Sequence, residues 1–306
     1  MTLSSNILEY LKFISAFSPP LPCHPLLPWF CYNISVMPKA GSYQTEAIII
    51  KKTKLGEADR ILTFYTPDMG KVQGVAKGVR KPKSKLSGHL ELLTHSMVLL
   101  TRGRGSLDTI TGSQTIDGFY PLKSDLDLGA CALYATELVN QFGVDRQENR
   151  PLFNLLLDLM RELCSIGPAS NDTGVNRSDS DILLRYFEVH LLQQVGYRPQ
   201  LRECVACRQA LPPAPTHYFS LSAGGVVCLA CKAKLSFTYA VSSSALQVFQ
   251  ALQDADWSSA GRVNPDPHTR RELEMLLRNY LRFILERDIR SVAWLDLLKH
   301  TRTGTG

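Results

Sequence analysis

Alternating apolar and polar positions dominate the chain from Tyr43 to about Phe119. Short apolar runs with a two-residue period indicate β-strands separated by turns. The runs occupy 47–50, 60–66, 71–76, 90–101 and 107–116. Between the second and third runs, the sequence Pro67-Asp68-Met69-Gly70 is typical of a turn, because proline presets φ and glycine accepts a positive φ. Five short strands in so compact a stretch predict a small closed barrel.

After Pro121 the apolar positions recur at helical spacing. Helices are predicted over 128–142, from 151 to 163, over 181–195, from Ser242 or Ser243 to 252, and from 269 to about 287. Gly196 is a stop signal for the third, and Thr269-x-x-Glu272 is predicted to be a capping box for the last. The segment 167–180 is rich in Ser, Asn, Asp and Gly and is predicted to be a loop. The fold class is therefore α+β, with a barrel followed by an all-helical domain.

Four cysteines interrupt the helical pattern as two Cys-x2-Cys pairs, Cys204 with Cys207 and Cys228 with Cys231. This spacing predicts one tetrahedral zinc ion held by four thiolates, which leave no ligand position open for substrate. The alternative is four buried free thiols, since cysteine packs well as a small apolar residue. A redox pair fits poorly, because two pairs lie in a loop-rich insert. A zinc deaminase does not fit either, because Glu203 rather than proline precedes the first pair.

Positive charge is concentrated in one part of the barrel sequence. The chain has a net charge of +6, and residues 70–104 alone hold eight cations and one acid, Glu91. The eight cations are Lys71, Lys77, Arg80, Lys81, Lys83, Lys85, Arg102 and Arg104. Five of them lie in the nine residues 77–85, between two predicted strands. A loop of this charge on a small barrel favours nucleic-acid binding over a solvated surface loop, with Arg102 and Arg104 as accessory phosphate contacts.

The first forty residues and the cysteine content limit the location of the chain. No charged residue occurs from Phe13 to Pro38, but five prolines between 19 and 28 exclude a membrane-spanning helix there. We predict that 1–40 is a disordered extension, or that Met37 is the true start.

Without a signal peptide, eight cysteines in a long chain indicate a reducing cytoplasm rather than a disulfide framework. No phosphate loop, nucleophile elbow or magnesium-binding acid cluster is found, so we expect no enzymatic activity.

Several motifs occur together along the chain. They are Tyr43-x-Thr45-x-Ala47-Ile48-Ile49, Gly56-Glu57-x-Asp59-Arg60, Thr66-Pro67-x-x-Gly70-Lys71, Ala76-Lys77-Gly78-x-Arg80-Lys81-Pro82-x-Ser84, Phe187-x-x-His190-Leu191-Leu192, Gly196-Tyr197-x-Pro199, and Phe283-Ile284-Leu285-Glu286-Arg287 with Arg290-Ser291. Together they resemble the RecO family of bacterial recombination-mediator proteins. The resemblance covers about residues 43–298. It implies an N-terminal OB-fold and a C-terminal helical domain that contains a zinc module.

The resemblance also implies a function and a set of partners. The family binds single- and double-stranded DNA, anneals complementary strands, and works with RecR, and in some members RecF, to load RecA onto strands coated by single-strand-binding protein. On this basis the domains are predicted at 1–40 (extension), 41–120 (OB-fold), 121–200 (first helical part), 201–235 (zinc module) and 236–300 (second helical part). We also expect association with the nucleoid and none with a membrane. Two alternatives are a protein-docking adaptor and an RNA-binding OB-fold protein.

Overall fold

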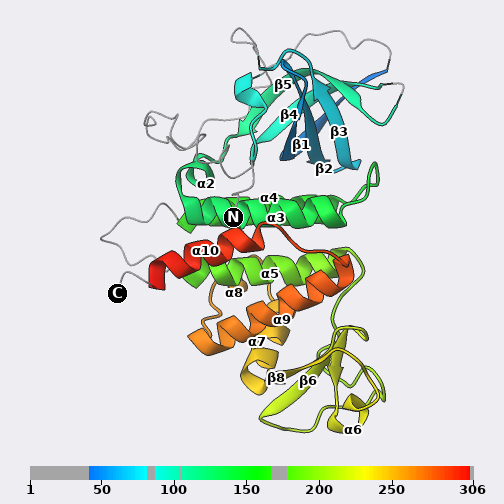
Figure 1. Cartoon of the computed structure of the whole chain (residues 1–306), viewed down its shortest axis with the longest axis vertical. Helices are drawn as coiled ribbons and strands as arrows, with labels where there is room; N and C mark the ends of the chain where they lie inside the picture. The colour runs from blue at the N-terminus through cyan, green and yellow to red at the C-terminus, as the bar shows by residue number, and fades with distance from the viewer. Residues whose placement is uncertain (1–40, 81–86, 104, 167–177, 304–306) are drawn as a thin grey trace.

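The computed structural model describes residues 41–80, 87–103, 105–166 and 178–303. The predicted extension 1–40 and most of the predicted loop 167–180 lie outside these ranges. The described chain consists of a barrel at one end, a layer of helices in the middle, and a small sheet with the four cysteines at the other end (Figure 1). None of the helices in these ranges is long and apolar enough to cross a membrane.

The barrel confirms the five predicted strands. They are β1 (Ser42–Leu55), β2 (Asp59–Thr66), β3 (Gly70–Ala76), β4 (His95–Thr101) and β5 (Asp108–Asp117), and they close in the order β1-β2-β3-β5-β4. All pairings are antiparallel except β3 with β5. Gly70 ends the β2–β3 turn at φ 54°, and a Cβ there would stand 2.0 Å from the carbonyl oxygen of Gln147. Glycine is therefore required at this turn.

The prediction of a strand from Leu90 is wrong at its start, because β4 begins only at His95. Residues 87–89 form a short 3-10 helix, η1 (Ser87–His89), and Leu93 has a left-handed backbone at φ 55°. Leu90 and Leu93 are both buried, with Leu90 in the barrel core and Leu93 in the helical core. The apolar run therefore reflects burial in an irregular segment, which the alternation pattern cannot distinguish from a strand.

Strand β1 joins the barrel to the helices through its apolar run. Ala47 and Ile49 belong to the core inside the barrel, whereas Ile48 and Ile50 belong to the helical core. Because successive side chains of a strand point to opposite faces, a run without alternation is expected where both faces are covered. Helix α3 (Leu126–Phe142) packs against β1. The barrel and the helices thus share one continuous apolar contact.

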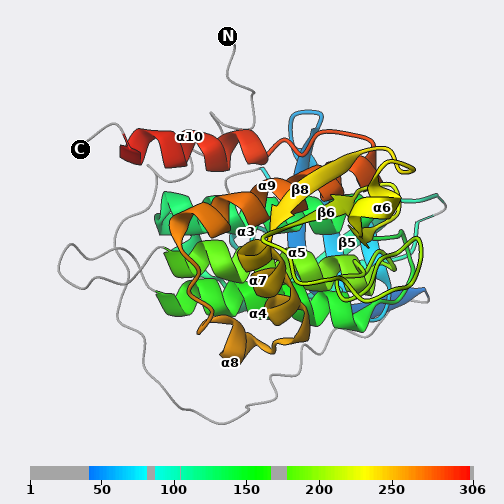
Figure 2. The ribbon, with the colours of Figure 1, turned by 90° about the horizontal axis from the view of Figure 1, so that it is seen from below.

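The helical part confirms the predicted helices. The helices that precede the four cysteines are α2 (Tyr120–Ser124), α3, α4 (Arg150–Ile166) and α5 (Ser178–Gln194). The longer helices that follow the four cysteines, and the short α8, are α7 (Ser243–Asp254), α8 (Trp257–Ala260), α9 (Pro267–Leu285) and α10 (Val292–Thr303). Figure 2 shows α3, α4 and α5 side by side behind the four-cysteine segment, with α10 along one flank. Ser242 caps α7 as predicted, since its side chain accepts a hydrogen bond from the Ala245 amide.

The predicted capping box of the last long helix is wrong. Helix α9 begins at Pro267, and Asp266 is its N-cap, accepting hydrogen bonds from the amides of His268 and Thr269. Glu272 lies within the helix and instead accepts hydrogen bonds from the amide and the hydroxyl of Ser242. The motif matched by letter, but Asp266 followed by proline is the stronger start signal. Glu272 therefore ties α9 to the start of α7.

Between α5 and α7 the chain forms a module that we call the four-cysteine module, residues 201–242. It contains β6 (Thr216–Ser220), β7 (Gly225–Val227), the short helix α6 (Leu229–Lys232) and β8 (Thr238–Ser242). The sheet order is β7-β6-β8, so β8 is an edge strand. Phe219, Val226 and Val241 point from this sheet into the helical core.

Candidate nucleic-acid interface and metal centre

The first part of the predicted basic loop is anchored to the β1–β2 turn. The Gly78 amide donates to the carboxylate of Asp59 at 2.7 Å, and the Arg80 amide donates to the Ala58 carbonyl at 3.1 Å. Between them, Val79 is 6% exposed and packs into the barrel core. Lys77 and Arg80 are exposed on either side of this anchor. The two cations are therefore presented at a fixed place on the barrel surface.

The other predicted cations of this loop, Lys81, Lys83 and Lys85, lie outside the described residues, as does Arg104. Arg102 is described and exposed. It follows β4 directly, and its guanidinium lies over the ring of Tyr43 at 5.9 Å from the centroid. Its amide donates to the Gly41 carbonyl at 3.1 Å, which fixes the turn beside the start of β1. Arg102 thus reaches the barrel surface from a different turn than Arg80.

Lys71 contributes to the local positive charge of the sequence but is held by the helical part. Its ammonium donates to the carbonyl of Asn140, in the last turn of α3, at 3.1 Å, and lies 3.4 Å from the Asp145 carboxylate. A cation at this position interacts favourably with the helix dipole. Glu91, the acid among residues 70–104, does not pair with Lys71, because its carboxylate lies 2.6 Å from the ammonium of Lys52. Lys71 is therefore a contact between the two parts of the molecule.

An ion pair between a buried carboxylate and an exposed arginine, which no local sequence signal indicates, also joins the barrel to the helices. Asp108, on β5, is 1% exposed, and its carboxylate lies 2.9 Å from the guanidinium of Arg146, which precedes α4. The Tyr43 hydroxyl donates to the same carboxylate. Burial, and then this hydrogen bond and the charge of Asp108, raise the pKa of Tyr43 to about 12, so the phenol stays neutral. Only the fold brings these three residues together, since they are far apart in sequence.

The four predicted metal ligands are brought together by the module. The four sulfur atoms lie within 4.8 Å of one another, and the Sγ atoms of Cys207 and Cys228 are 3.9 Å apart. The two pairs are joined through their backbones, because the Val205 amide donates to the Val226 carbonyl at 2.9 Å. Cys204 is buried, whereas Cys207 is exposed. The cluster can hold a metal ion.

The environment of these thiols favours a bound cation. Burial acts to raise the pKa of Cys204, but backbone hydrogen bonds at Cys228, Cys207 and Ala206 outweigh it and lower that pKa to about 6. The pKa of Cys231 is instead raised to about 12, first by its hydrogen bond with Cys228 and then by burial. The hydrogen bonds within the cluster therefore ease the ionisation of Cys204 and hinder that of Cys231. A bound metal ion would hold all four sulfurs as thiolates.

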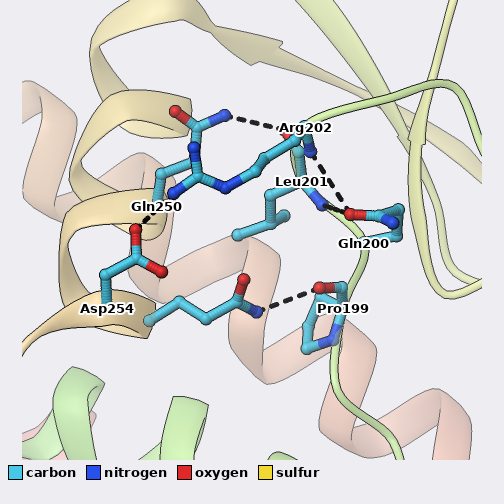
Figure 3. Close-up of polar contacts among 7 residues, drawn as sticks. Pro199, Gln200, Leu201, Arg202, Gln250 and Asp254 are labelled. Carbon is cyan, nitrogen blue, oxygen red and sulfur yellow. Dashed lines mark hydrogen bonds and ion pairs between the residues drawn. The ribbon is translucent and has the colours of Figure 1, made fainter. Parts of the chain in front are cut away.

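The chain leading into the module is fixed to α7 by amide side chains (Figure 3). Gln253 donates to the Pro199 carbonyl at 2.9 Å, and Gln250 donates to the Leu201 carbonyl at 2.7 Å. Arg202 forms an ion pair with Asp254 at the end of the same helix. These contacts satisfy carbonyl groups that no strand pairs, just before the first cysteine. The module is therefore held against the helices at its base.

Comparison with known proteins gives matches along nearly the whole described chain. Residues 39–119 match the family described as "Recombination protein O N terminal", and residues 123–293 match "Recombination protein O C terminal". Many relatives carry the name DNA repair protein RecO, and three of them illustrate the similarity. The chain is 43% identical to the protein of Dehalococcoides mccartyi strain CBDB1 (86% of this chain, 98% of the relative), 42% to that of Roseiflexus sp. strain RS-1 (83% and 85%), and 33% to that of Pelotomaculum thermopropionicum (86% and 97%).

Proposed function

The chain belongs to the RecO family of DNA repair proteins, and on this premise we propose that it binds single- and double-stranded DNA through the basic surface of the barrel and anneals complementary strands. The observation that carries the proposal is the anchoring of Arg80 and Lys77 beside the β1–β2 turn. In small barrels of this kind, the turn after the first strand borders the surface that binds oligonucleotides. In the sequence, three further lysines follow Arg80 closely: Lys81, Lys83 and Lys85.

Annealing by this protein needs no bond chemistry. Two complementary strands repel each other through their phosphates, and cations of the loop offset this repulsion while releasing counterions from the strands. Phosphate contacts carry no base information, so the surface accepts any sequence. Base pairing then supplies the specificity. The role of the protein in this scheme is to bring two polyanions close together.

The partners of the protein follow from the family. We expect it to act with RecR, and in some settings RecF, to help load the recombinase RecA onto strands coated by single-strand-binding protein, in the cytoplasm at the nucleoid.

The rival function is an adaptor whose basic loop binds an acidic protein tail and does not bind DNA itself. Binding of naked oligonucleotide in the absence of any partner separates the two. Competition between RNA and DNA strands tests the second rival, an RNA-binding protein.

For the metal we propose zinc, bound by Cys204, Cys207, Cys228 and Cys231. Zinc–sulfur bonds of about 2.3 Å place the sulfurs of a regular tetrahedron about 3.8 Å apart. The 3.9 Å between Cys207 and Cys228, and the 4.8 Å limit on all pairs, need only a small contraction to reach this value. Four thiolates leave no open ligand position, so the ion would brace the module.

The central test replaces Arg80, Lys81, Lys83 and Lys85 by alanine. We expect much weaker binding of single-stranded oligonucleotides, and a salt dependence (log of affinity against log of salt) flatter by about 0.7 for each phosphate that the variant no longer neutralises. Fluorescence anisotropy at several salt concentrations measures both. A matched control removes four exposed arginines of the helical part, Arg161, Arg262, Arg271 and Arg290. If both variants bind equally weakly, or if the slope does not change, the loop is not the DNA site.

A further inference from the structure

Three exposed aromatic residues lie on or next to β8 and on α9, two elements that contact each other. Phe237 is 61% exposed, and Tyr239 and Phe283 are each 37% exposed. The rings of Phe237 and Phe283 contact each other at 5.7 Å between centroids, with an angle of 50° between their planes. Phe237 precedes the edge strand β8, Tyr239 lies on it, and Phe283 belongs to the last turn of α9. We call these three residues the aromatic surface.

The backbone at Phe237 indicates that its exposed ring is not a by-product of folding. Its φ is 55°, in the left-handed region, where a bulky side chain is costly and glycine is not. The carbonyl of Phe237 accepts a hydrogen bond from the Leu221 amide at 3.0 Å, which holds the backbone in place. Burial does not repay the cost, because most of the side chain is in solvent. Phe237 is one of six non-glycine residues with a positive φ among the described residues, and strain of this kind is enriched at functional positions.

The sequence around Phe237 and Tyr239 has more cations than acids, whereas near Phe283 the cations Arg282 and Arg287 are balanced by Glu286 and Asp288. No Asp or Glu occurs from Val205 to Gln253, whereas this stretch holds three cations, Arg208, Lys232 and Lys234. Lys234 is exposed three residues before Phe237. With a divalent ion bound, however, four thiolates contribute a net charge of −2, so the field is only weakly positive. An anionic ligand bound here must therefore gain most of its affinity from the rings.

Single-stranded nucleic acid matches these properties, because each nucleotide offers a flat base as well as a phosphate. Aromatic side chains stack on the bases of single strands without regard to sequence. A peptide partner would have to repeat acidic and aromatic groups at the same spacing to match as well. The four-cysteine module lies at the end of the molecule opposite to the barrel, and α9 belongs to the helical layer between them (Figure 1). Two strands can therefore be held at once without meeting at the same site.

We propose that the aromatic surface is a second binding site for single-stranded DNA, which stacks bases on Phe237, Tyr239 and Phe283. The proposal rests on the proposed DNA binding of the barrel and adds a second site to it. The two sites differ in chemistry, since the barrel holds phosphates and the aromatic surface holds bases. One molecule can then hold one strand at each of the two sites, or adjacent molecules can share a strand.

The test uses two variants, Phe237→Gly and Phe283→Ala, in the full-length, metal-loaded protein. Oligothymidine and an abasic strand of equal length are the probes, and fluorescence anisotropy is measured at low and high salt. We expect about ten-fold weaker binding of oligothymidine at both salt concentrations, which corresponds to the loss of one stacked base. Binding of the abasic strand should not change. Met275→Ala, which removes a 57% exposed apolar side chain from α9, is the matched control and should bind both strands normally.

The same variants test the structural alternative. Glycine relieves the left-handed backbone at position 237, so Phe237→Gly should keep or raise the Tm while losing affinity. A lower Tm with unchanged oligothymidine binding would show that the ring only packs, and would overturn the proposal. A change of oligomeric state without a change in DNA binding would overturn it too, in favour of self-association. If the basic-loop variant loses DNA binding but these variants do not, only the second site is disproved. If the unaltered protein does not bind oligonucleotides, both proposals are disproved.

Discussion

The barrel and the four-cysteine module, at opposite ends of the molecule, reach stability by different means. The barrel closes on itself and encloses a core of its own, with Ile49, Leu62 and Phe64 at its centre. The module has three strands of three to five residues and a four-residue helix. Its buried side chains, such as Phe219 and Val241, belong to the core of the helices. A sheet of this size needs outside support to stay folded.

This difference shows how each end can present its binding groups. The barrel is held by burial and strand pairing, so its turns are available for charged side chains such as Arg80 and Arg102. The module keeps Leu229 and Phe237 in solvent, at 72% and 61% exposure, and so has little apolar surface left for its own stability. A metal ion held by the sulfur cluster would compensate for this, because it would replace the missing core.

Removing the metal should have the largest effect and should be confined to one end. We expect Cys204→Ser to abolish metal binding and to unfold residues 201–242, because structural zinc contributes on the order of 10 kcal/mol to folding in small domains. The barrel should stay folded. Hydrogen exchange of backbone amides, together with metal analysis, measures both effects. Cys164→Ala, on α4, is the control and should retain the metal. Protection of the module amides in metal-free protein would contradict the comparison.

Breaking the ion pair between the barrel and the helices should have an intermediate effect. Arg146→Ala leaves the carboxylate of Asp108 buried without its cation, and we expect a loss of about 2 kcal/mol in the free energy of unfolding. This value is at the low end for buried pairs, because the Arg146 side chain is 37% exposed. Urea unfolding measures the loss. Asp108→Asn in the same background should recover part of it, since the amide oxygen can still accept from Tyr43; no recovery would mean that Arg146 acts only by packing.

The sequence predicts the elements of both ends well, because their signals are local. Period-2 alternation, the turn at Pro67–Gly70 and the paired cysteines each reflect a few neighbouring residues, and all are found in the structure. The family motifs add the order of the parts. The seven predicted DNA-binding cations are a different matter, because the structure describes only Lys77, Arg80 and Arg102 among them. Their role stays a prediction.

The sequence could not predict what depends on contacts between distant segments. Glu272 matches a capping box by letter, yet its carboxylate binds Ser242, thirty positions away. Asp108 gives no local signal of burial, yet in the structure it is buried and bound by Arg146 and Tyr43. The exposed ring of Phe237 has no sequence signal, since aromatic residues are normally assigned to a core. A positive φ at that position becomes visible only in the structure.

The smallest expected effect concerns protons at the joint between the barrel and the helices. His95, on β4, is 3% exposed, with its ring against the edge of Phe153 at 5.8 Å. Burial is the largest effect on the His95 pKa and lowers it. The carboxylate of Glu46, at 3.4 Å, raises the pKa but only offsets part of this effect. Smaller effects come from Arg161, which lowers the pKa, and from Asp117, which raises it. The folded pKa is thus below the unfolded value of about 6.5.

It follows that the unfolded chain binds a proton at His95 more tightly than the folded chain does. Stability is therefore unaffected by this group above about pH 6.5 and falls as the pH drops below it, by at most about 1.4 kcal/mol per pH unit. We expect His95→Gln to reduce this loss, measured as the difference between urea midpoints at neutral and mildly acidic pH. His190 also has a pKa lowered by burial, so His190→Gln is the parallel variant for the helical part. An unchanged acid dependence in His95→Gln would show that the joint does not sense protons, and that only the helices and the module respond to acid.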